Sequence, residues 1–282
     1  MKKPFLIKKC LFPVAGFGTR FLPATKAIPK EMLPILTKPL IQYGIEEAMN
    51  AGIFNMAMVT SKYKQAIKNH FEPHVDIESR VRGTSTEELL DAVNYASRVC
   101  NFTYIEQKKL LGLGHAIYQA KSIIGDEPFA VILPDDLCTN NGESALEQMA
   151  KLYEQFPDCC IVAIKEVPIA EVNKYGVIDG QILNEMHNVY RVNHMVEKPN
   201  SDDAPSNLAI VGRYILIPEI FDVLGKTNPD KNGEIQITDA LMELAKLGKV
   251  IAYKFQGERF DCGTIKGFVD ATNYFAKQEN II

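Results

Sequence analysis

The feature that most constrains this fold is the alternation of short apolar runs with amphipathic segments along roughly the first 170 residues. The apolar runs predict strands at 10–15, 55–60, 101–106, 129–133 and 160–167. Apolar positions at helical spacing predict helices at 40–51, 63–71, 86–99, 115–124 and 144–156. Because strands that alternate with helices usually form a sheet covered on both faces, we predict an α/β fold with a Rossmann-like, mostly parallel central sheet.

The helix expected at 86–99 has a start signal in its sequence. Ser85 and Glu88 have the spacing of a capping box, in which two side chains bond the free backbone N–H groups of the first turn. Leu89, Val93 and Ala96 fall on one face of the segment, which predicts that this face packs on the core.

The pattern changes from about residue 175 onward. In YGVIDGQILN, Asp179 and Gly180 lie between two alternating runs, which predicts a hairpin turn. The polar segment 201–207 predicts a loop, and helices are expected to begin near Ile237 and to span 265–278. The second half is therefore expected to be β-rich and more antiparallel, so that the central sheet is mixed.

No internal repeat or low-complexity linker divides the 282 residues. The hydrophobic content of 46% and charged content of 23% are ordinary for a globular protein without a membrane span. We therefore expect a single domain over 1–282, with an α/β half at about 1–170 and a β-rich half with the C-terminal helices at about 171–282.

Charge and cysteine content limit the partners of the chain. A net charge of −4 argues against nucleic-acid binding, so a site for phosphates needs local lysines and arginines. Lys8 and Lys9 interrupt the apolar part of the N-terminal MKKPFLIKKC, which is unlike a signal peptide and favours a cytoplasmic protein. The six cysteines have no CxxC spacing, which is typical of reduced thiols and does not indicate a metal cluster.

A glycine-rich, basic segment, AGFGTRFLPATKAIPKEM, follows the first predicted strand. Phe21 takes the place of the third glycine of a dinucleotide fingerprint, and a Walker Gly-Lys-Ser/Thr is absent. What remains is G-x-G-T-R followed by Lys26 and Lys30, whose backbone N–H groups and cations can surround a triphosphate. An ordinary strand-to-helix turn with solvated charges is the alternative, but the prolines at 23 and 29 favour the phosphate interpretation.

Two further segments have residues suited to ligand binding. ILPDDL ends an apolar strand in Asp135 and Asp136, and a carboxylate at that end of an α/β sheet points into the ligand crevice, unless it only caps a helix or turn. Gln107, after the third predicted strand, can accept from N3–H of uracil and donate to O4, although a glutamine before two lysines is often a solvated strand end.

Several separated segments, in one order, resemble a known family. They are AGFGTRFLPATKAIPKEMLPI, EQKKLLGLGHA, VILPDDL, KYGVI, VEKP, VGRYIL, GEIQITDA and FDCGT. They span essentially the whole chain and resemble the sugar-1-phosphate nucleotidyltransferases, and PKEMLP is typical of the bacterial uridylyltransferases among them. The resemblance implies that UTP and glucose 1-phosphate give UDP-glucose and pyrophosphate, by Mg²⁺-assisted in-line attack of the sugar phosphate on the α-phosphate. It also suggests a homo-oligomer, a dimer or tetramer.

The resemblance assigns residues to each substrate. The first half would bind the nucleotide through Ala15, Gly16, Gly18, Thr19, Arg20, Glu31, Gln107 and Gly112. The second half would bind the sugar phosphate through Gly176, Glu197 and Lys198, although Glu-Lys-Pro at a strand end can also be an exposed turn. The residues expected to act in catalysis are Arg20, Lys30, Asp135 and Lys198.

The same resemblance makes Asp135 and Asp261 the Mg²⁺ ligands and leaves Asp136 to support the loop, while Asp261 as an ordinary turn residue is the alternative. The attacking phosphate is already anionic, so no covalent nucleophile is needed, and His115 is interpreted as a structural residue at a helix start. Three alternatives remain: a thymidylyltransferase, a nucleotide-sugar-dependent glycosyltransferase and a non-catalytic regulatory homologue.

Overall fold

One nine-stranded sheet forms the centre of the protein in the computed structural model, which describes residues 6–183 and 186–282. In spatial order the strands are β5 (Asn101–Glu106), β4 (Asn55–Thr60), β1 (Lys9–Pro13), β6 (Phe129–Ile132), β11 (Leu208–Leu216), β8 (Cys160–Glu166), β12 (Val250–Lys254), β10 (Val189–Glu197) and β9 (Gly176–Ile182). The start of the N-terminal segment discussed above, residues 1–5, lies outside the described residues.

The sheet is mixed. β5, β4, β1 and β6 are parallel to one another, whereas β11 is antiparallel to both β6 and β8. Among the described residues five of the nine strand pairings in this sheet are antiparallel, so the expected parallel order holds only for β5, β4, β1 and β6 and for the β8–β12 pair. The change to antiparallel pairing in the second half is confirmed.

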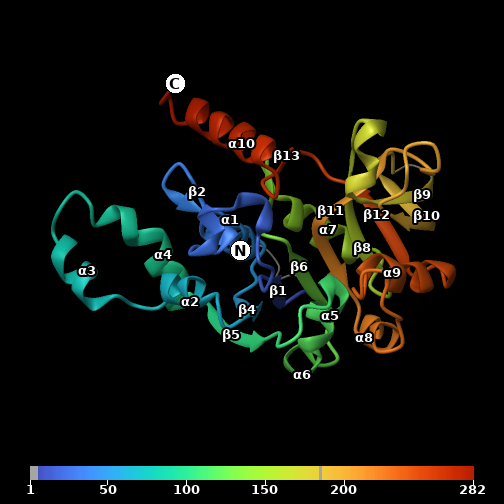
Figure 1. Ribbon diagram of the computed structural model, residues 1–282, viewed down its shortest axis with the longest axis horizontal. Helices are drawn as coiled ribbons and strands as arrows, with labels where there is room; N and C mark the ends of the chain where they lie inside the picture. The colour runs from blue at the N-terminus through green and yellow to red at the C-terminus, as the bar shows by residue number, and fades with distance from the viewer. Residues whose placement is uncertain (1–5, 184–185) are drawn as a thin grey trace.

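Helices cover both faces of the sheet (Figure 1). One group contains α1 (Leu40–Asn50), α2 (Gln65–Phe71), α4 (Glu88–Val99) and α7 (Ala145–Tyr153), which contact one another. The other contains α5 (Gly112–Gln119), α8 (Glu219–Leu224) and α9 (Ile237–Lys246), with α6 (Lys121–Ile124) beside α5. All residues of β6 are buried, as expected for a central strand between two helical layers. The short α3 (Val75–Val81) extends to one side together with α4 (Figure 1).

Three local predictions in the first half are wrong. Leu89, expected to pack on the core with Val93 and Ala96, is 74% exposed in the first turn of α4, and only the other two residues of this face are buried. Ser85 and Glu88 form no capping box, because α4 begins at Glu88 after Glu87 and its start has no side-chain cap. A capping box occurs instead at α7, where Ser144 accepts from the Glu147 N–H and Glu147 accepts in return. The single helix expected at 115–124 is two helices, α5 and α6, which meet at Ala120.

The predicted hairpin exists, but its turn is displaced. Asp179 and Gly180 lie inside β9, where they pair with His194 and Val192 of β10 across a β-bulge. A Cβ on Gly180 would lie 3.0 Å from the Arg191 carbonyl oxygen, so the glycine serves the close strand approach at the bulge instead of a turn. The antiparallel pairing of β9 and β10 continues to Ile182 and Tyr190, and residues 184–185 lie outside the described residues.

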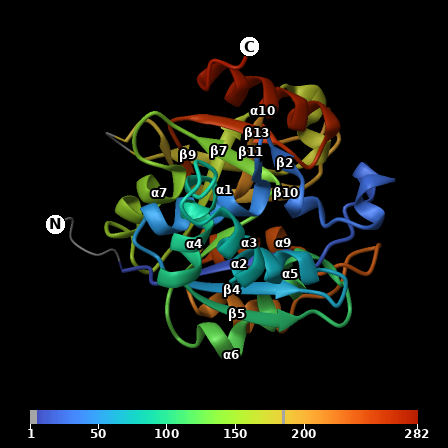
Figure 2. The same cartoon turned by 90° about the vertical axis from the view of Figure 1, so that its left-hand side faces the viewer.

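A second, two-stranded sheet lies beside the first. β7 (Asp136–Thr139) pairs antiparallel with β13 (Glu258–Asp261), with Asp136 opposite Asp261. β13 leads into the C-terminal helix α10 (Ile265–Gln278), which lies above β13 in Figure 2 and contacts both β13 and the short strand β2 (Pro34–Ile35). This pairing brings together two aspartates that are distant in the sequence.

The structure also bears on the predictions about the cysteines and about a membrane span. All six cysteines are free thiols. Among residues 6–183 and 186–282, no helix is both long enough and apolar enough to cross a membrane.

Candidate active site

Two adjoining hollows lie where β1 and β6 end, and Asp135 lines both of them. Hollow A, of about 320 Å³, is lined by these predicted site residues: Ala15, Gly16, Lys30, Glu31, Gln107, Gly112 and Asp135. Hollow B, of about 280 Å³, is lined by these: Arg20, Asp135, Gly176, Glu197, Lys198 and Asp261. The structure therefore brings the predicted residues into two neighbouring groups, and Asp135 joins them.

In hollow A, the side chain of Gln107 is buried and held by hydrogen bonds. Its amide nitrogen lies 2.8 Å from His115 Nδ1 and 3.4 Å from the Gly112 carbonyl oxygen. Gly112 has φ +88°, and a Cβ there would lie 2.9 Å from Glu234 Cβ. Only glycine fits this position easily, and its backbone borders the hollow beside Gln107.

Glu31 is fully buried at the wall of hollow A. One carboxylate oxygen accepts from Lys64 Nζ at 2.8 Å, in an ion pair that is shielded from solvent. Burial raises the pKa of Glu31 above its ordinary value, although the Lys30 and Lys64 charges act in the other direction. Its Oε1 has no hydrogen-bond partner among the described residues. Glu31 therefore offers one unused acceptor at this hollow.

Asp135 and Lys30 form an ion pair at the boundary of the two hollows, with 2.5 Å between Oδ2 and Nζ. Burial alone would raise the pKa of Asp135, but Lys30 holds it below its ordinary value. Burial would likewise lower the pKa of Lys30, but the carboxylates of Asp135 and Glu31 hold it above its ordinary value. Both groups are therefore charged at neutral pH.

Asp261 faces the same space as Asp135. A Cβ placed on Gly263 would lie 3.0 Å from Asp135 Oδ2 and 3.1 Å from Asp261 Oδ1, so both carboxylates border the gap left by this glycine. Tyr175 donates from its hydroxyl to Asp261 Oδ2 at 2.9 Å. Arg259 in turn donates to the Tyr175 oxygen at 3.1 Å, which fixes the hydroxyl between the two.

Asp136 is buried and serves the structure. Its Oδ1 accepts from Arg259 Nε and its Oδ2 accepts from the Gly212 N–H at 2.6 Å. The two neighbouring aspartates thus differ: Asp135 faces the hollows, and Asp136 anchors the turn to β11 and β13. This matches the expectation that Asp136 supports the loop.

A buried ion pair between Arg213 and Glu47 supports the turn at 133–136 on its core side. Arg213 on β11 binds both carboxylate oxygens of Glu47 on α1, at 2.8 to 3.1 Å. The same guanidinium donates to the Leu133 carbonyl oxygen at 3.3 Å. A Cβ on Gly212 would lie 2.7 Å from Leu133 Cβ and 2.8 Å from Asp136 Cβ, so the close approach of β11 to the turn needs this glycine.

In hollow B, Glu197 and Lys198 end strand β10. Glu197 accepts from the Thr238 hydroxyl at 2.6 Å and pairs with Lys198 Nζ at 3.0 Å. Lys198 is exposed and has φ +47°, an unusual conformation for a residue other than glycine. A Cβ on Gly176 would lie 3.0 Å from the Thr238 hydroxyl, so this glycine leaves its backbone open toward Glu197.

Arg20 and Lys26, the two basic residues of the glycine-rich loop at 15–29, border different depressions of the surface. Arg20 lines hollow B and donates to the Gly263 carbonyl oxygen at 3.4 Å. Thr19 and Lys26 line neither hollow; they border a separate depression with Phe17 and Tyr63. Gly18 has φ +66°, and a Cβ there would lie 2.9 Å from Lys30 Cβ, so its role is to let the loop pass Lys30.

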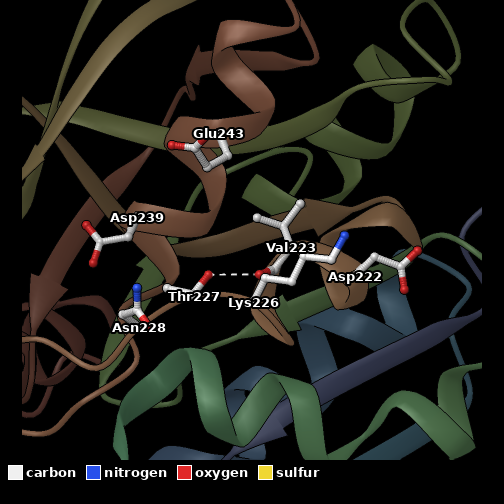
Figure 3. A pocket seen from close by; sticks show the side chains of 7 residues that line it. All are labelled: Asp222, Val223, Lys226, Thr227, Asn228, Asp239 and Glu243. Atoms are coloured by element: carbon white, nitrogen blue, oxygen red, sulfur yellow. Dashed lines mark hydrogen bonds between the residues drawn. The ribbon is translucent and has the colours of Figure 1, made fainter.

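A third hollow, of about 560 Å³, lies between α8 and α9 (Figure 3). Three carboxylates, Asp222, Asp239 and Glu243, line it with the single lysine Lys226. The Thr227 hydroxyl is already used, since it donates to the Val223 carbonyl oxygen at 2.9 Å. This acidic lining disfavours phosphate groups, and no predicted site residue is among the described residues that line it.

Sequence reasoning missed four residues of this region: Tyr175, Arg259, Glu234 and Thr238. Tyr175 and Arg259 contact Asp261, Thr238 contacts Glu197, and Glu234 lines both hollows. Glu234 and Thr238 lie in the segment GEIQITDA, and Tyr175 lies in KYGVI, so the signal was present as motifs without assigned roles.

The chain is similar to known proteins over most of its length. Residues 13–278 match the family model described as nucleotidyl transferase. The chain is 56% identical over 270 residues to a UTP–glucose-1-phosphate uridylyltransferase of Pseudomonas aeruginosa, covering 95% of this chain and 96% of that protein.

Two solved structures are also similar. The crystal structure of an apo UDP-glucose pyrophosphorylase has a TM-score of 0.93 and 54% identity, and covers 97% of this chain and 99% of that one. A UDP-glucose pyrophosphorylase complexed with UDP-glucose has a TM-score of 0.89 and 52% identity, with 96% and 99% coverage.

Proposed function

This chain belongs to the nucleotidyl transferase family, and on that premise we propose that it is a UTP–glucose-1-phosphate uridylyltransferase. The reaction joins UTP and glucose 1-phosphate and gives UDP-glucose and pyrophosphate. The observation that carries the proposal is the pair of hollows joined at Asp135, one with the Gln107 amide and the other with Glu197 and Lys198.

Hollow A takes the nucleotide in this proposal. Gln107 and the backbone of Gly112 meet the uracil, and Ala15, Gly16 and Glu31 border the rest of the nucleoside. The loop containing Gly18, Thr19 and Arg20 would close over the triphosphate, as the backbone N–H groups of glycine-rich loops do elsewhere. Because the protein as a whole has a net charge of −4, the positive charge that attracts the triphosphate must come locally, from Arg20 and Lys30.

Hollow B takes the sugar phosphate. The Glu197 carboxylate can accept from sugar hydroxyls, and Thr238 holds it in orientation through the 2.6 Å hydrogen bond. The backbone at Gly176 has no side chain between it and the sugar. Lys198 is exposed, so its side chain has room to leave Glu197 and bind the phosphate, which carries more charge than one carboxylate.

The donor set at the boundary fits a magnesium ion. Asp135 and Asp261 border the same gap, and Mg²⁺ prefers one or two carboxylates completed by phosphate oxygens and water. When bound, the ion would neutralise charge on the phosphates and help to orient them. Tyr175 and Arg259 would keep the Asp261 carboxylate facing this gap.

In this reaction the protein needs to align the two substrates, and it does not need to transfer a proton. An anionic oxygen of glucose 1-phosphate attacks the α-phosphorus of UTP, and the bond from that phosphorus to the bridging oxygen of pyrophosphate breaks. The attacking oxygen carries its own electron pair and no proton, so no general base is required. Arg20, Lys30 and Lys198 hold two polyanions in line and stabilise the charge on the departing pyrophosphate.

Pyrophosphate release tests the proposal, measured across a grid of nucleoside triphosphates and sugar 1-phosphates with Mg²⁺ present. We expect the highest kcat/KM for UTP with glucose 1-phosphate. A methyl group in a pocket changes specificity by only about 1–3 kcal/mol, so some use of dTTP is compatible. A clear preference for dTTP would indicate a thymidylyltransferase, and absence of pyrophosphate release with every pair would contradict the proposal.

We also propose that residues 1–282 act as one catalytic unit within a homo-oligomer, a dimer or tetramer. One sheet spans both halves of the chain, which supports a single unit. Val75 on α3 and Leu89 on α4 expose 70% and 74% of their surface, and such apolar residues are suited to an interface. Sedimentation equilibrium measures the mass in solution, and a monomer would contradict the oligomer.

A cytoplasmic location completes the proposal. The free thiols of all six cysteines are compatible with a reducing compartment. Fractionation of cells that produce the protein, followed by immunodetection in each fraction, tests the location; recovery in the membrane or secreted fraction would contradict it.

A further inference from the structure

Three side chains form a hydrogen-bonded row from hollow A to the exposed side of α5: Gln107, His115 and Gln119. The Gln107 amide nitrogen lies 2.8 Å from His115 Nδ1, and His115 Nε2 lies 3.2 Å from the amide nitrogen of Gln119. Gln107 is only 5% exposed, whereas His115 and Gln119 are half-buried. The row therefore begins at a buried amide that lines the hollow.

Two arrangements of protons can satisfy this row. In the first, Gln107 donates to Nδ1 and the proton of the imidazole is on Nε2, so the half-buried Gln119 amide must turn over for its oxygen, in place of its nitrogen, to accept that proton. In the second, the proton is on Nδ1 and is donated to the Gln107 oxygen, so that the Gln107 amide nitrogen faces the hollow. The two arrangements present opposite groups to a bound base.

The carbonyl of Gly112 decides between them. A carbonyl oxygen only accepts hydrogen bonds, and the Gly112 oxygen lies 3.4 Å from the nitrogen of the Gln107 amide. The nitrogen therefore faces both Gly112 and His115, as in the first arrangement. Gln107 Oε1 then has no partner among the described residues and is available at hollow A. Burial lowers the pKa of His115 below its ordinary value, so the ring is neutral at pH 7 and Nδ1 can accept.

We propose that His115 is a positioning residue for base selection, which fixes Gln107 with its Oε1 toward the base. A fixed acceptor matches the N3–H of uracil and opposes cytosine, whose N3 is itself an acceptor. This inference rests on the proposed function and adds the device by which the site selects its base. It also assigns His115 a part in specificity that its place at a helix start does not indicate.

The same geometry predicts between which bases the enzyme does not discriminate. Thymine has the same N3–H as uracil, so the row does not distinguish UTP from dTTP. Without His115, the Gln107 amide can rotate and present its nitrogen, which suits the N3 acceptor of cytosine. Loss of His115 should therefore change the ratio of UTP to CTP and leave the ratio of UTP to dTTP unchanged.

The test compares kcat/KM for UTP, CTP and dTTP with glucose 1-phosphate in the full-length enzyme. His115→Leu removes the acceptor, while His115→Asn keeps an oxygen acceptor at the place of Nδ1. We expect H115L to lower the UTP-to-CTP ratio at least tenfold and H115N to retain it within about threefold. Nitrogen NMR of the imidazole adds a readout independent of activity, and we expect the proton on Nε2.

His70→Leu is the matched control, because His70 also contacts a glutamine amide, Gln42 at 3.0 Å, but lines neither hollow. Should H115L fail to fold, His115→Gln, which places its polar end nearer Nε2, replaces it, again against H115N. An unchanged UTP-to-CTP ratio in H115L, an equal loss with all three nucleotides, or a proton on Nδ1 would overturn the inference. A wild-type enzyme that shows no preference for UTP over CTP would overturn the proposed base selection itself.

Discussion

The turn at 133–136 and the glycine-rich loop at 15–29 border the same two hollows, but their support differs. The turn is bound from three elements: β11 through Gly212 and Arg213, β13 through Arg259, and the 30–32 segment through Lys30. Each of these contacts is at least partly buried. The position of Asp135 is therefore set by the core of the protein.

The loop at 15–29 makes most of its hydrogen bonds within itself, and its packing on distant elements includes the Phe21 ring against Phe268 of α10. Its hydrogen bonds join residues of the loop, such as the Thr25 hydroxyl to the Gly18 carbonyl at 2.8 Å. Among the described residues, its hydrogen bonds to distant parts of the chain reduce to Arg20 with Gly263 at 3.4 Å. Phe17 and Leu22 expose 57% and 58% of their surface. Such a loop can adjust to the ligand it meets.

The difference separates two tasks. Fixed carboxylates suit a site whose ligand must be held in line, because a small displacement there reduces the rate strongly. A locally supported loop suits a triphosphate that must enter and a pyrophosphate that must leave. Substitutions in the turn should therefore reduce stability or turnover, and substitutions in the loop should act mainly on nucleotide binding.

The largest effect is expected beneath the turn, with Glu47→Leu. This change leaves the fully buried Arg213 without its anion, which typically costs about 3–5 kcal/mol of the free energy of unfolding. Denaturant unfolding measures it. The double variant with Arg213→Met should recover most of the loss, since apolar side chains can replace a buried ion pair. A loss below about 1 kcal/mol in the single variant would show that the pair does not support the turn.

The two aspartates of the turn should separate activity from stability. Asp135→Asn is expected to lower kcat by about 10²–10³, the cost of a lost preorganised electrostatic contact, with a small change in unfolding. Asp136→Asn should instead lower the free energy of unfolding by about 2 kcal/mol, because it weakens charged hydrogen bonds to Gly212 and Arg259. Turnover against Mg²⁺ concentration and chemical unfolding are measured for both. Equal behaviour of the two variants would contradict the division.

Glycine replacements compare the two regions directly. Gly212→Ala should cost about 2–3 kcal/mol of unfolding free energy, since its Cβ would lie within 2.8 Å of two side chains of the turn. Gly18→Ala should cost about 1–2 kcal/mol, because its φ is +66°. Gly16→Ala is the control, with nothing within 4 Å of the new Cβ, and thermal melts should show little change. A reversed order would mean that the loop is the more tightly supported region.

The smallest effect on stability is expected for Lys26→Met. Lys26 is exposed and lines the outer depression, so unfolding should change by no more than about 0.5 kcal/mol. Because it borders neither hollow, KM for UTP should rise less than threefold, whereas Arg20→Met should raise it more. Steady-state kinetics distinguish them. A larger rise in KM for UTP with Lys26→Met than with Arg20→Met would show that the loop moves closer to the bound nucleotide than its position in this structure.

The sequence predicted what depends on local pattern. The strands of the first half, the Asp135–Asp136 strand end and the motifs at Gln107 and Glu197 all lie where periodicity and spacing placed them. Ser85 is not the cap because α4 begins at Glu88, two residues later than the spacing predicts, so that Glu87 occupies the cap position. These are local choices that a short motif does not determine.

Other features follow from contacts between distant segments. The Gly180 position is explained by its strand partner Arg191, and no residue near Gly180 in the sequence indicates that partner. Arg259 and Thr238 were missed for the same reason, since their importance comes from Asp136 and Glu197 across the sheet. The sequence indicates only a helix-start position for His115. Its contact with Gln107 depends on how the loop between the two residues folds back, which no local pattern predicts.

The pairing of β7 with β13 has a consequence for the synthesis of this protein. Asp135 is made in the first half of the chain, but its companion Asp261 is on the last strand before the C-terminal helix. Domains fold from the N-terminus as they leave the ribosome, so the sheet can begin to assemble long before the second carboxylate exists. A chain that stops short of residue 258 would keep β1, β4, β5 and β6, yet lack one side of the gap at Gly263. Translation itself thus delays activity until the ribosome has passed Asp261.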